Sequence, residues 1–125
     1  MPRILIAEDD EPVRTLVARA LSENGHQVVT AADGGAALET LTREQGRFDL
    51  LLTDIQMPVM DGIALALAAA RDHPDVTILL MTGYADQRER ASGLELLIRD
   101  VIAKPFTLTT ICGAVRDALK AEQMH

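Results

Sequence analysis

The segment DLLLTDIQMPVMDG, residues 49–62, runs a short apolar strand directly into a single carboxylate. Residues 50–53 have the length and apolar character of a buried strand, and Asp54 follows them at once. Met57 and Pro58 then stop regular structure from continuing, because proline lacks the backbone donor that a strand or helix uses. A strand that ends in a lone acid indicates a chemical role for Asp54, provided that the other strands end in the same way.

The rest of the chain alternates between two patterns. Short apolar or β-branched runs typical of buried strands cover residues 4–7, 28–30, 50–53, 76–81 and 101–103. Apolar residues at helical spacing cover residues 13–21, 36–43, 63–71, 94–98 and 108–119. Continuous apolar strands that alternate with helices predict a parallel sheet covered on both faces. We therefore expect an α/β fold, a flavodoxin-like (βα)5 doubly wound parallel sheet with strand order 2-1-3-4-5.

Length and composition predict a single domain. The chain has 125 residues, enough for one core, and shows no linker or repeat. We expect one domain over residues 1–125, with the last helix reaching nearly to His125 and no second domain attached. The N-terminus has the form of neither a signal peptide nor a membrane span, and the single cysteine, Cys112, fits a reducing compartment. These features predict a cytoplasmic protein that does not contact membranes.

The charge argues against a nucleic-acid partner. The net charge is −7, and the only lysines are Lys104 and Lys120. Binding to a phosphate backbone needs clustered basic side chains, and stacking on bases needs aromatic ones. Since the chain has only three aromatic residues, we expect no nucleic-acid binding.

Polar side chains follow four of the five predicted strands. In open α/β sheets the functional site lies at the carboxyl ends of the strands. In the order 2-1-3-4-5 the one strand without such a side chain lies at an edge, so the other four ends are neighbours. We expect one shallow pocket formed by Glu8, Asp9, Asp54, Thr82 and Lys104.

Such a pocket favours a divalent cation. Two carboxylates about 4 Å apart repel by roughly 4 kcal/mol at an effective dielectric near 20, so they keep a proton or bind a cation. Mg²⁺ prefers a few protein oxygens together with water and phosphate. The predicted ligands are Glu8, Asp9, Asp54 and the backbone carbonyl of Gln56, whereas Asp10 is predicted only to begin a helix.

A cation in an acidic pocket can accept a phosphoryl group. Asp54 would then be the nucleophile that forms an acyl phosphate. Mg²⁺ and Lys104 would hold the phosphoryl oxygens, and Thr82 would donate its hydroxyl to one of them. The sequence therefore predicts that Asp54 is phosphorylated.

Three other classes share parts of this pattern. A phosphatase of the haloacid dehalogenase type needs a second Asp two residues after the nucleophile, where this chain has Gln56. A flavodoxin needs a phosphate-binding loop rich in Gly, Ser and Thr where this chain has acids. A phosphorylation-independent interaction module of the same fold is harder to exclude, and the complete set of acids, hydroxyl and lysine argues against it.

Four motifs resemble a known family. ILIAEDD, LLLTDIQMPVMDG, LLMTGY and IAKPF occur in the order and spacing of the receiver domain of two-component response regulators. The resemblance covers the whole chain. It implies a phosphorelay protein that catalyses only its own phosphotransfer and dephosphorylation, with a histidine kinase or histidine phosphotransferase as its phosphodonor.

The resemblance also assigns roles to single residues. It implies that Asp9 binds Mg²⁺ directly and Glu8 through water, and that Gln56 contributes its carbonyl. Thr82 matches the switch hydroxyl and Lys104 the phosphate-binding lysine, whose bond to the following proline is expected to be cis.

Two departures from the family pattern stand out. The aromatic residue that the family usually carries three positions before the lysine is Val101 here. Tyr84, two residues after Thr82, is a hypothetical substitute for it. The usual Gly-Ala before the fifth strand is also missing, and LELLIRDV suggests a shifted or irregular fourth helix.

Four features together resemble CpdR-type regulators of alphaproteobacteria: the stand-alone form, the segments LLLTDI and MTGY, and the Val101 departure. The resemblance implies a receiver without an output domain that helps the ClpXP protease degrade substrates when unphosphorylated. ClpX would then be the downstream partner, and phosphorylation would turn the effect off. A phosphate sink is an alternative role. The sequence itself does not identify the kinase, the downstream partner, the sign of the output or the oligomeric state.

Overall fold

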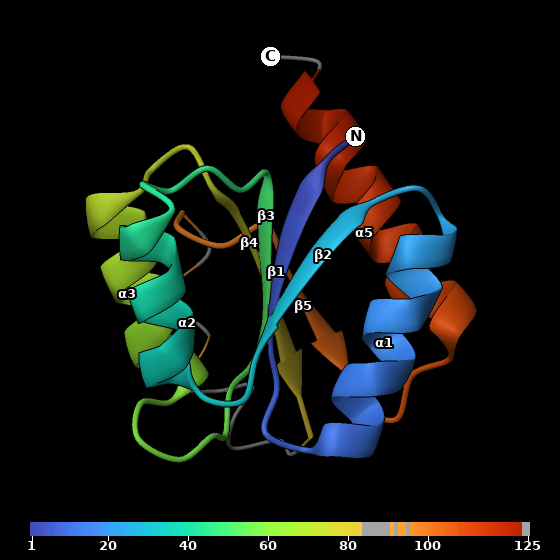
Figure 1. Cartoon of the computed structure of the whole chain (residues 1–125), viewed down its shortest axis with the longest axis horizontal. Coiled ribbons are helices and arrows are strands. Elements are labelled where there is room, and N and C mark those ends of the chain that lie inside the picture. Colours follow the sequence, from blue (N-terminus) through green and yellow to red (C-terminus); the bar gives the residue numbers. More distant parts are fainter. Residues whose placement is uncertain (84–90, 92, 95, 124–125) are drawn as a thin grey trace.

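Five parallel strands form one sheet with the order β2-β1-β3-β4-β5 (Figure 1). The computed structural model describes residues 1–83, 91, 93–94 and 96–123. The strands are β1 (Arg3–Ala7), β2 (Gln27–Ala31), β3 (Leu50–Asp54), β4 (Thr77–Thr82) and β5 (Asp100–Ala103). This confirms the predicted fold class and strand order, with β4 one residue later than its sequence pattern predicted.

Helices cover both faces of the sheet. In Figure 1, α2 and α3 lie on one side and α1 and α5 on the other. The helices are α1 (Glu11–Glu23), α2 (Gly34–Arg43), α3 (Gly62–Asp72) and α5 (Leu108–Gln123). An aspartate begins each of the first three by accepting a backbone N–H of the first turn, which satisfies a donor that the helix itself leaves free. These caps are Asp10, Asp33 and Asp61.

The two core layers follow from the alternation of side chains along each strand. Ile4 and Ile6 of β1 pack on the side of α1 and α5, whereas Leu5 and Ala7 pack on the side of α2 and α3. Every residue of β3 is buried, as expected for a central strand with helices on both faces. This strand carries Asp54 at its end and therefore holds it on a rigid support.

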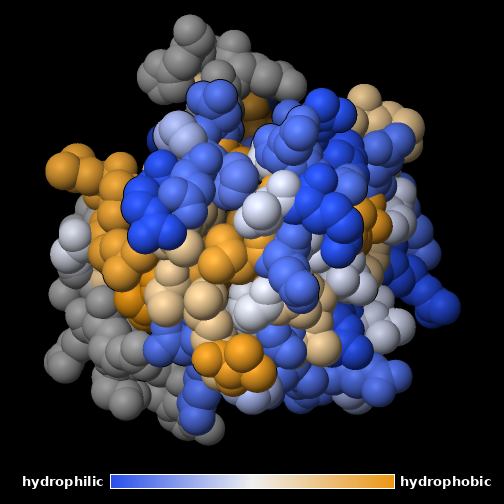
Figure 2. All heavy atoms as spheres, turned by 60° about the vertical axis from the view of Figure 1, so that its left-hand side comes forward, coloured by the Kyte–Doolittle hydropathy of each residue, from blue (hydrophilic) through white to orange (hydrophobic). Residues whose placement is uncertain are grey.

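The face formed by α2 and α3 carries apolar surface among hydrophilic side chains (Figure 2). The helix α3 has no charged residue before Arg71, and Leu67 on it is 45% exposed. No described helix is long and apolar enough to cross a membrane.

The helix predicted over residues 94–98 is not found in the described part of that segment. Residues 94 and 96–98 form a turn in which the N–H groups of Leu97 and Ile98 donate to Leu94 O. Leu94 and Ile98 pack against the core, whereas Leu96 is exposed. The apolar spacing therefore comes from two core contacts at the ends of a turn. Residues 84–90, 92 and 95 lie outside the described residues, and the prediction for Tyr84 lies there too.

Candidate functional site

The site lies at the carboxyl ends of four neighbouring strands. Glu8 directly follows β1, and Asp54 is the last residue of β3. Thr82 is the last residue of β4, and Lys104 directly follows β5. The sheet order that brings these strands together therefore also brings together side chains that are up to 96 residues apart in the sequence.

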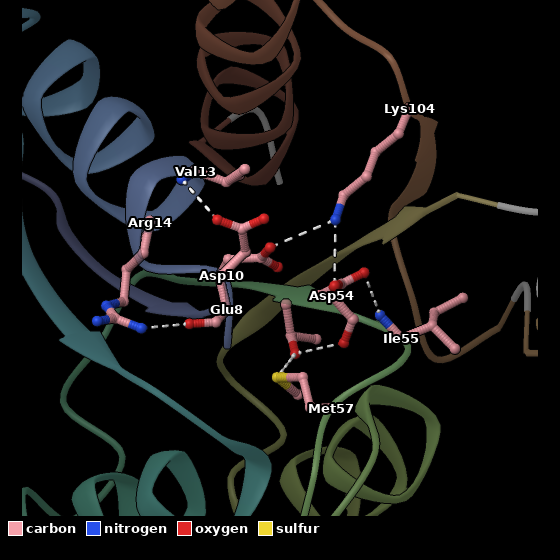
Figure 3. A network of polar contacts seen from close by, with 9 residues as sticks. Glu8, Asp10, Val13, Arg14, Asp54, Ile55, Met57 and Lys104 are labelled. Carbon is pink, nitrogen blue, oxygen red and sulfur yellow. Dashed lines mark hydrogen bonds and ion pairs between the residues drawn. The ribbon is translucent and has the colours of Figure 1, made fainter.

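Lys104 bridges two carboxylates at the centre of the site (Figure 3). Its Nζ lies 3.1 Å from Asp54 Oδ2 and 3.4 Å from Glu8 Oε1. Both acids are buried, and the lysine side chain is 27% exposed. The amine is therefore fixed beside the carboxylate that the sequence predicts to be phosphorylated.

Three carboxylates form a cluster suited to a metal ion. Glu8, Asp9 and Asp54 each offer a ligand oxygen, and these oxygens lie within 4.8 Å of one another. Glu8 is only 1% exposed, and its Oε2 is buried without a hydrogen-bond partner among the described residues. A buried acceptor without a partner is costly unless a ligand satisfies it. The donor set of hard oxygens therefore fits Mg²⁺, which binds such oxygens while keeping some of its own water.

Burial and charge shift the pKa values of two groups in the site. Burial, together with the hydrogen bond and negative charge of Asp54, raises the pKa of Glu8 to about 8 against the opposing effect of Lys104. For Lys104, burial alone would lower the pKa, but the Asp54 and Glu8 carboxylates outweigh it and the pKa is raised. At neutral pH the site without metal therefore holds a protonated Glu8 and a charged Lys104.

Local backbone packing fixes the orientation of Asp54. Its Oδ1 accepts a hydrogen bond of 2.9 Å from the N–H of Ile55. The next helix approaches closely behind it, because the N–H of Gly62 donates to Ile55 O at 2.7 Å. A Cβ at Gly62 would lie 2.0 Å from the backbone oxygen of Asp54. Only glycine allows this approach, so the Asp61-Gly62 pair both begins α3 and supports the acid.

The carboxylates open into a pocket of about 660 Å³ that both polar and apolar residues line. Thr82 is buried at the end of β4, and among the described residues its neighbour Gly83 lines the pocket instead. Gln56 also lines the pocket. The described lining residues are Glu8, Asp9, Asp10, Val13, Asp54, Gln56, Gly83, Lys104, Pro105 and Phe106.

Several finer predictions have a clear outcome. Asp10 is the N-cap of α1 and accepts from the N–H of Val13 at 3.4 Å, as predicted. The Lys104-Pro105 bond is cis. Val101 occupies the position of the expected aromatic and packs, half-buried, against the core on the side of α2 and α3.

Sequence reasoning missed Arg14. Its guanidinium donates to the backbone oxygen of Glu8 at 2.8 Å (Figure 3). Its position four residues after Asp10, in the first turns of a helix that begins at the site, is a signal that could have pointed to it. The apolar lining by Val13 and Phe106 was missed as well, because apolar residues there are equally typical of a core.

Comparisons with known proteins point to one family. The profile of the response regulator receiver domain family matches residues 4–116. CpdR of Brucella abortus, a response regulator receiver protein, is 39% identical over 121 residues, which cover 97% of this chain and 99% of CpdR.

Two further relatives extend this comparison. The transcriptional regulatory protein PrrA of Mycobacterium tuberculosis is 34% identical over 119 residues, or 95% of this chain, and this chain spans about half (50%) of the length of PrrA. The response regulator TrrA of Thermotoga maritima, solved in complex with Mg²⁺ and BeF, superposes with a TM-score of 0.83 at 29% identity. That match covers 94% of this chain and 99% of TrrA.

Proposed function

Because this chain belongs to the response regulator receiver domain family and is a homologue of CpdR, we propose that it accepts a phosphoryl group on Asp54. The donor is a phosphohistidine of a histidine kinase or of a histidine phosphotransferase. The observation that carries this proposal is the 3.1 Å contact of Lys104 Nζ with Asp54 Oδ2 beside a cluster of carboxylates. In this proposal residues 1–125 form one receiver domain that acts in the cytoplasm.

Each residue of the site can have its own role in the phosphoryl transfer. An Asp54 carboxylate oxygen attacks the phosphorus, and the phosphorus–nitrogen bond of the donor breaks with its electron pair leaving on the imidazole. Lys104 contacts Asp54 before the transfer and can then bind a phosphoryl oxygen, on which negative charge develops. Thr82, on the adjacent strand end, donates its hydroxyl to another phosphoryl oxygen. The only reactions that the chain catalyses are its own phosphorylation and dephosphorylation.

A metal ion completes the charge balance. Glu8, Asp9, Asp54 and the carbonyl of Gln56 would hold Mg²⁺, with Asp9 as a direct ligand and Glu8 acting through water. When bound, Mg²⁺ neutralises the clustered acids and the charge of the incoming phosphoryl group. The buried Glu8 Oε2 without a described partner supports this ligand set.

The apolar residues that line the pocket support docking of a protein donor. Val13, Pro105 and Phe106 lie beside the carboxylates and Lys104 in the same pocket. A donor helix that presents its histidine to Asp54 can bury apolar side chains on this surface, while the polar centre selects the phosphoryl group. Small phosphodonors lack that contact, so we expect transfer from them to be slower.

Labelling with a small phosphodonor tests the proposal. The purified protein is incubated with acetyl phosphate and Mg²⁺, and the expected result is an acid-stable, base-labile phosphoryl group that Asp54→Ala does not acquire. Release of phosphate from many phosphoesters would instead favour a phosphatase. Absence of labelling, together with no response to Mg²⁺, would favour a phosphorylation-independent interaction module.

Output through protein contact is the second part of the proposal. Exposed apolar side chains such as Val59, Leu67 and Leu96 offer surface for a partner. The resemblance to CpdR-type regulators nominates ClpX, bound by the unphosphorylated form and released on phosphorylation. Purified ClpX should then be retained by the wild type and by Asp54→Ala, and lost by the wild type after treatment with acetyl phosphate. Retention that is equal in both phosphorylation states, or no retention at all, would refute this output.

A further inference from the structure

We infer that Arg14 is a positioning residue for the metal site, which holds the Glu8-Asp9 backbone in place before the ion binds. The inference rests on the proposed function, since it concerns the Mg²⁺ ligands of that site. It assigns a role to a residue of α1 that offers no ligand oxygen. The role follows from which atom the guanidinium contacts, because that atom belongs to the backbone and not to a carboxylate.

The backbone of Glu8 is tied on both sides. Its N–H donates to Ala31 O at the end of β2, at 3.1 Å. Its carbonyl accepts from Arg14 Nη1 at 2.8 Å, on the side of α1. Figure 3 shows the Arg14 side chain reaching across to Glu8 from the helix, away from Lys104 and Asp54. Both backbone groups of Glu8 thus have a hydrogen-bond partner, although the residue lies beyond the end of β1.

The arginine is itself anchored to the same loop. Its backbone N–H donates to Asp10 O at 2.9 Å, and the Asp10 side chain caps the helix. Arg14 therefore binds both ends of the loop from Glu8 to Asp10: its guanidinium donates to Glu8 O, and its backbone N–H donates to Asp10 O. Since Asp9 lies between these two contacts, the backbone positions of both Glu8 and Asp9, the predicted metal ligands, are restricted. A ligand set that is fixed in advance loses less entropy when the ion binds.

Arginine suits this task better than other side chains. A hydrogen bond from a charged donor to a carbonyl is about twice as strong as a neutral one. The guanidinium also keeps its charge at every pH of interest, so the contact does not depend on the protonation of the acids. A lysine at position 14 would keep the positive charge but would lack the planar guanidinium that donates to the Glu8 carbonyl.

Electrostatics and positioning predict opposite effects when the charge of Arg14 is removed. A cation near an acidic site repels Mg²⁺, so simple charge removal should tighten metal binding. Loss of a group that holds the ligands should weaken binding, typically about tenfold for contacts of this kind. The sign of the change in Mg²⁺ affinity therefore decides whether Arg14 is a nearby charge or a positioning residue.

The test is calorimetric titration of Mg²⁺ into metal-free wild type, Arg14→Gln, Arg14→Lys and Arg19→Gln. Arg19 lies exposed on the same helix, so its substitution is a control matched in element and in charge. We expect Arg14→Gln to raise the Mg²⁺ Kd about tenfold, Arg14→Lys to recover part of the loss, and Arg19→Gln to stay within about twofold. The Mg²⁺ concentration that half-saturates labelling by acetyl phosphate should rise by the same factor in Arg14→Gln.

The outcomes separate this inference from the function on which it rests. An Arg14→Gln protein that binds Mg²⁺ as tightly as the wild type, or more tightly, overturns the positioning role. A wild type that binds no Mg²⁺ overturns the proposed function, and this inference with it. If Arg14→Gln does not fold, as judged by thermal unfolding, the same titration of Arg14→Lys decides, with a Kd equal to that of the wild type counting against the inference.

Discussion

Replacing Glu8 by glutamine should stabilise the metal-free protein and weaken its response to Mg²⁺. Glu8 is 1% exposed, one of its oxygens has no described partner, and its pKa is raised to about 8. Glutamine has the shape of the protonated acid and can donate to Asp54 in the same way, but it cannot ionise. The substitution therefore removes the free-energy cost of keeping Glu8 protonated in the folded state above pH 4.5.

The sign and size of the effect follow from the pKa. The unfolded chain releases the proton of Glu8 near pH 4.5, whereas the folded chain keeps it up to about pH 8. Between these values the folded state holds more protons, so the free energy of unfolding of the wild type should fall as the pH rises, by at most about 1.4 kcal/mol per pH unit. Over the whole range the upper bound is about 5 kcal/mol, so we expect a gain of a few kcal/mol for Glu8→Gln at pH 8 and almost none at pH 4.5.

Urea unfolding between pH 4.5 and 8, with a chelator and then with Mg²⁺, measures both effects. In the chelator the stability of the two proteins should diverge as the pH rises. With Mg²⁺ the wild type should gain more stability than Glu8→Gln, because binding to the folded state alone adds RT ln(1 + [Mg²⁺]/Kd). Glu39→Gln, a change of the same charge at an exposed position of α2, is the control and should shift stability by less than about 0.5 kcal/mol. A difference between wild type and Glu8→Gln that is the same at pH 5 and pH 8 would refute this reasoning.

Three further predictions follow from the packing and charges around the site. Lys104→Met should slow labelling by acetyl phosphate on the order of 100-fold at saturating Mg²⁺, because a fixed cation beside the phosphoryl oxygens is lost; a rate within threefold of the wild type would contradict its role. Gly62→Ala should destabilise the chain by about 3 kcal/mol or more in urea unfolding, because the added Cβ would lie 2.0 Å from Asp54 O. Gly113→Ala in α5 is the control: its Cβ would meet nothing closer than 3.6 Å, so it should be neutral or stabilising by up to about 1 kcal/mol. Val59→Asn should raise the free energy of unfolding by about 1 kcal/mol, since Val59 is 86% exposed and has φ of 71°, a region that asparagine tolerates better. A loss of stability would contradict this reasoning.

The sequence predicted the elements whose signals are local. The strands could be found because each is a short apolar run, and Asp10 could be recognised as a helix start because capping depends on neighbouring residues. The site followed from one topological rule, since Glu8, Asp54 and Lys104 meet only if the strands take the order 2-1-3-4-5.

The features that were missed depend on contacts between distant or unusual parts of the chain. The sequence did not predict that Glu8 is buried whereas the adjacent Asp9 is exposed. The Arg14 contact depends on where the end of β1 lies relative to α1. The turn at residues 94–98 has helical spacing, but its exposed Leu96 shows that an apolar pattern does not fix which side chains meet the core.

The most direct test of the account is a crystal structure of this chain with Mg²⁺ and beryllofluoride, which stands in for the phosphoryl group. The account predicts one Mg²⁺ in contact with Asp9 and Asp54, the beryllium bonded to an Asp54 oxygen, and Lys104 Nζ within hydrogen-bond distance of a fluoride. A metal ion bound elsewhere, or Lys104 turned away from an unmodified Asp54, would contradict it.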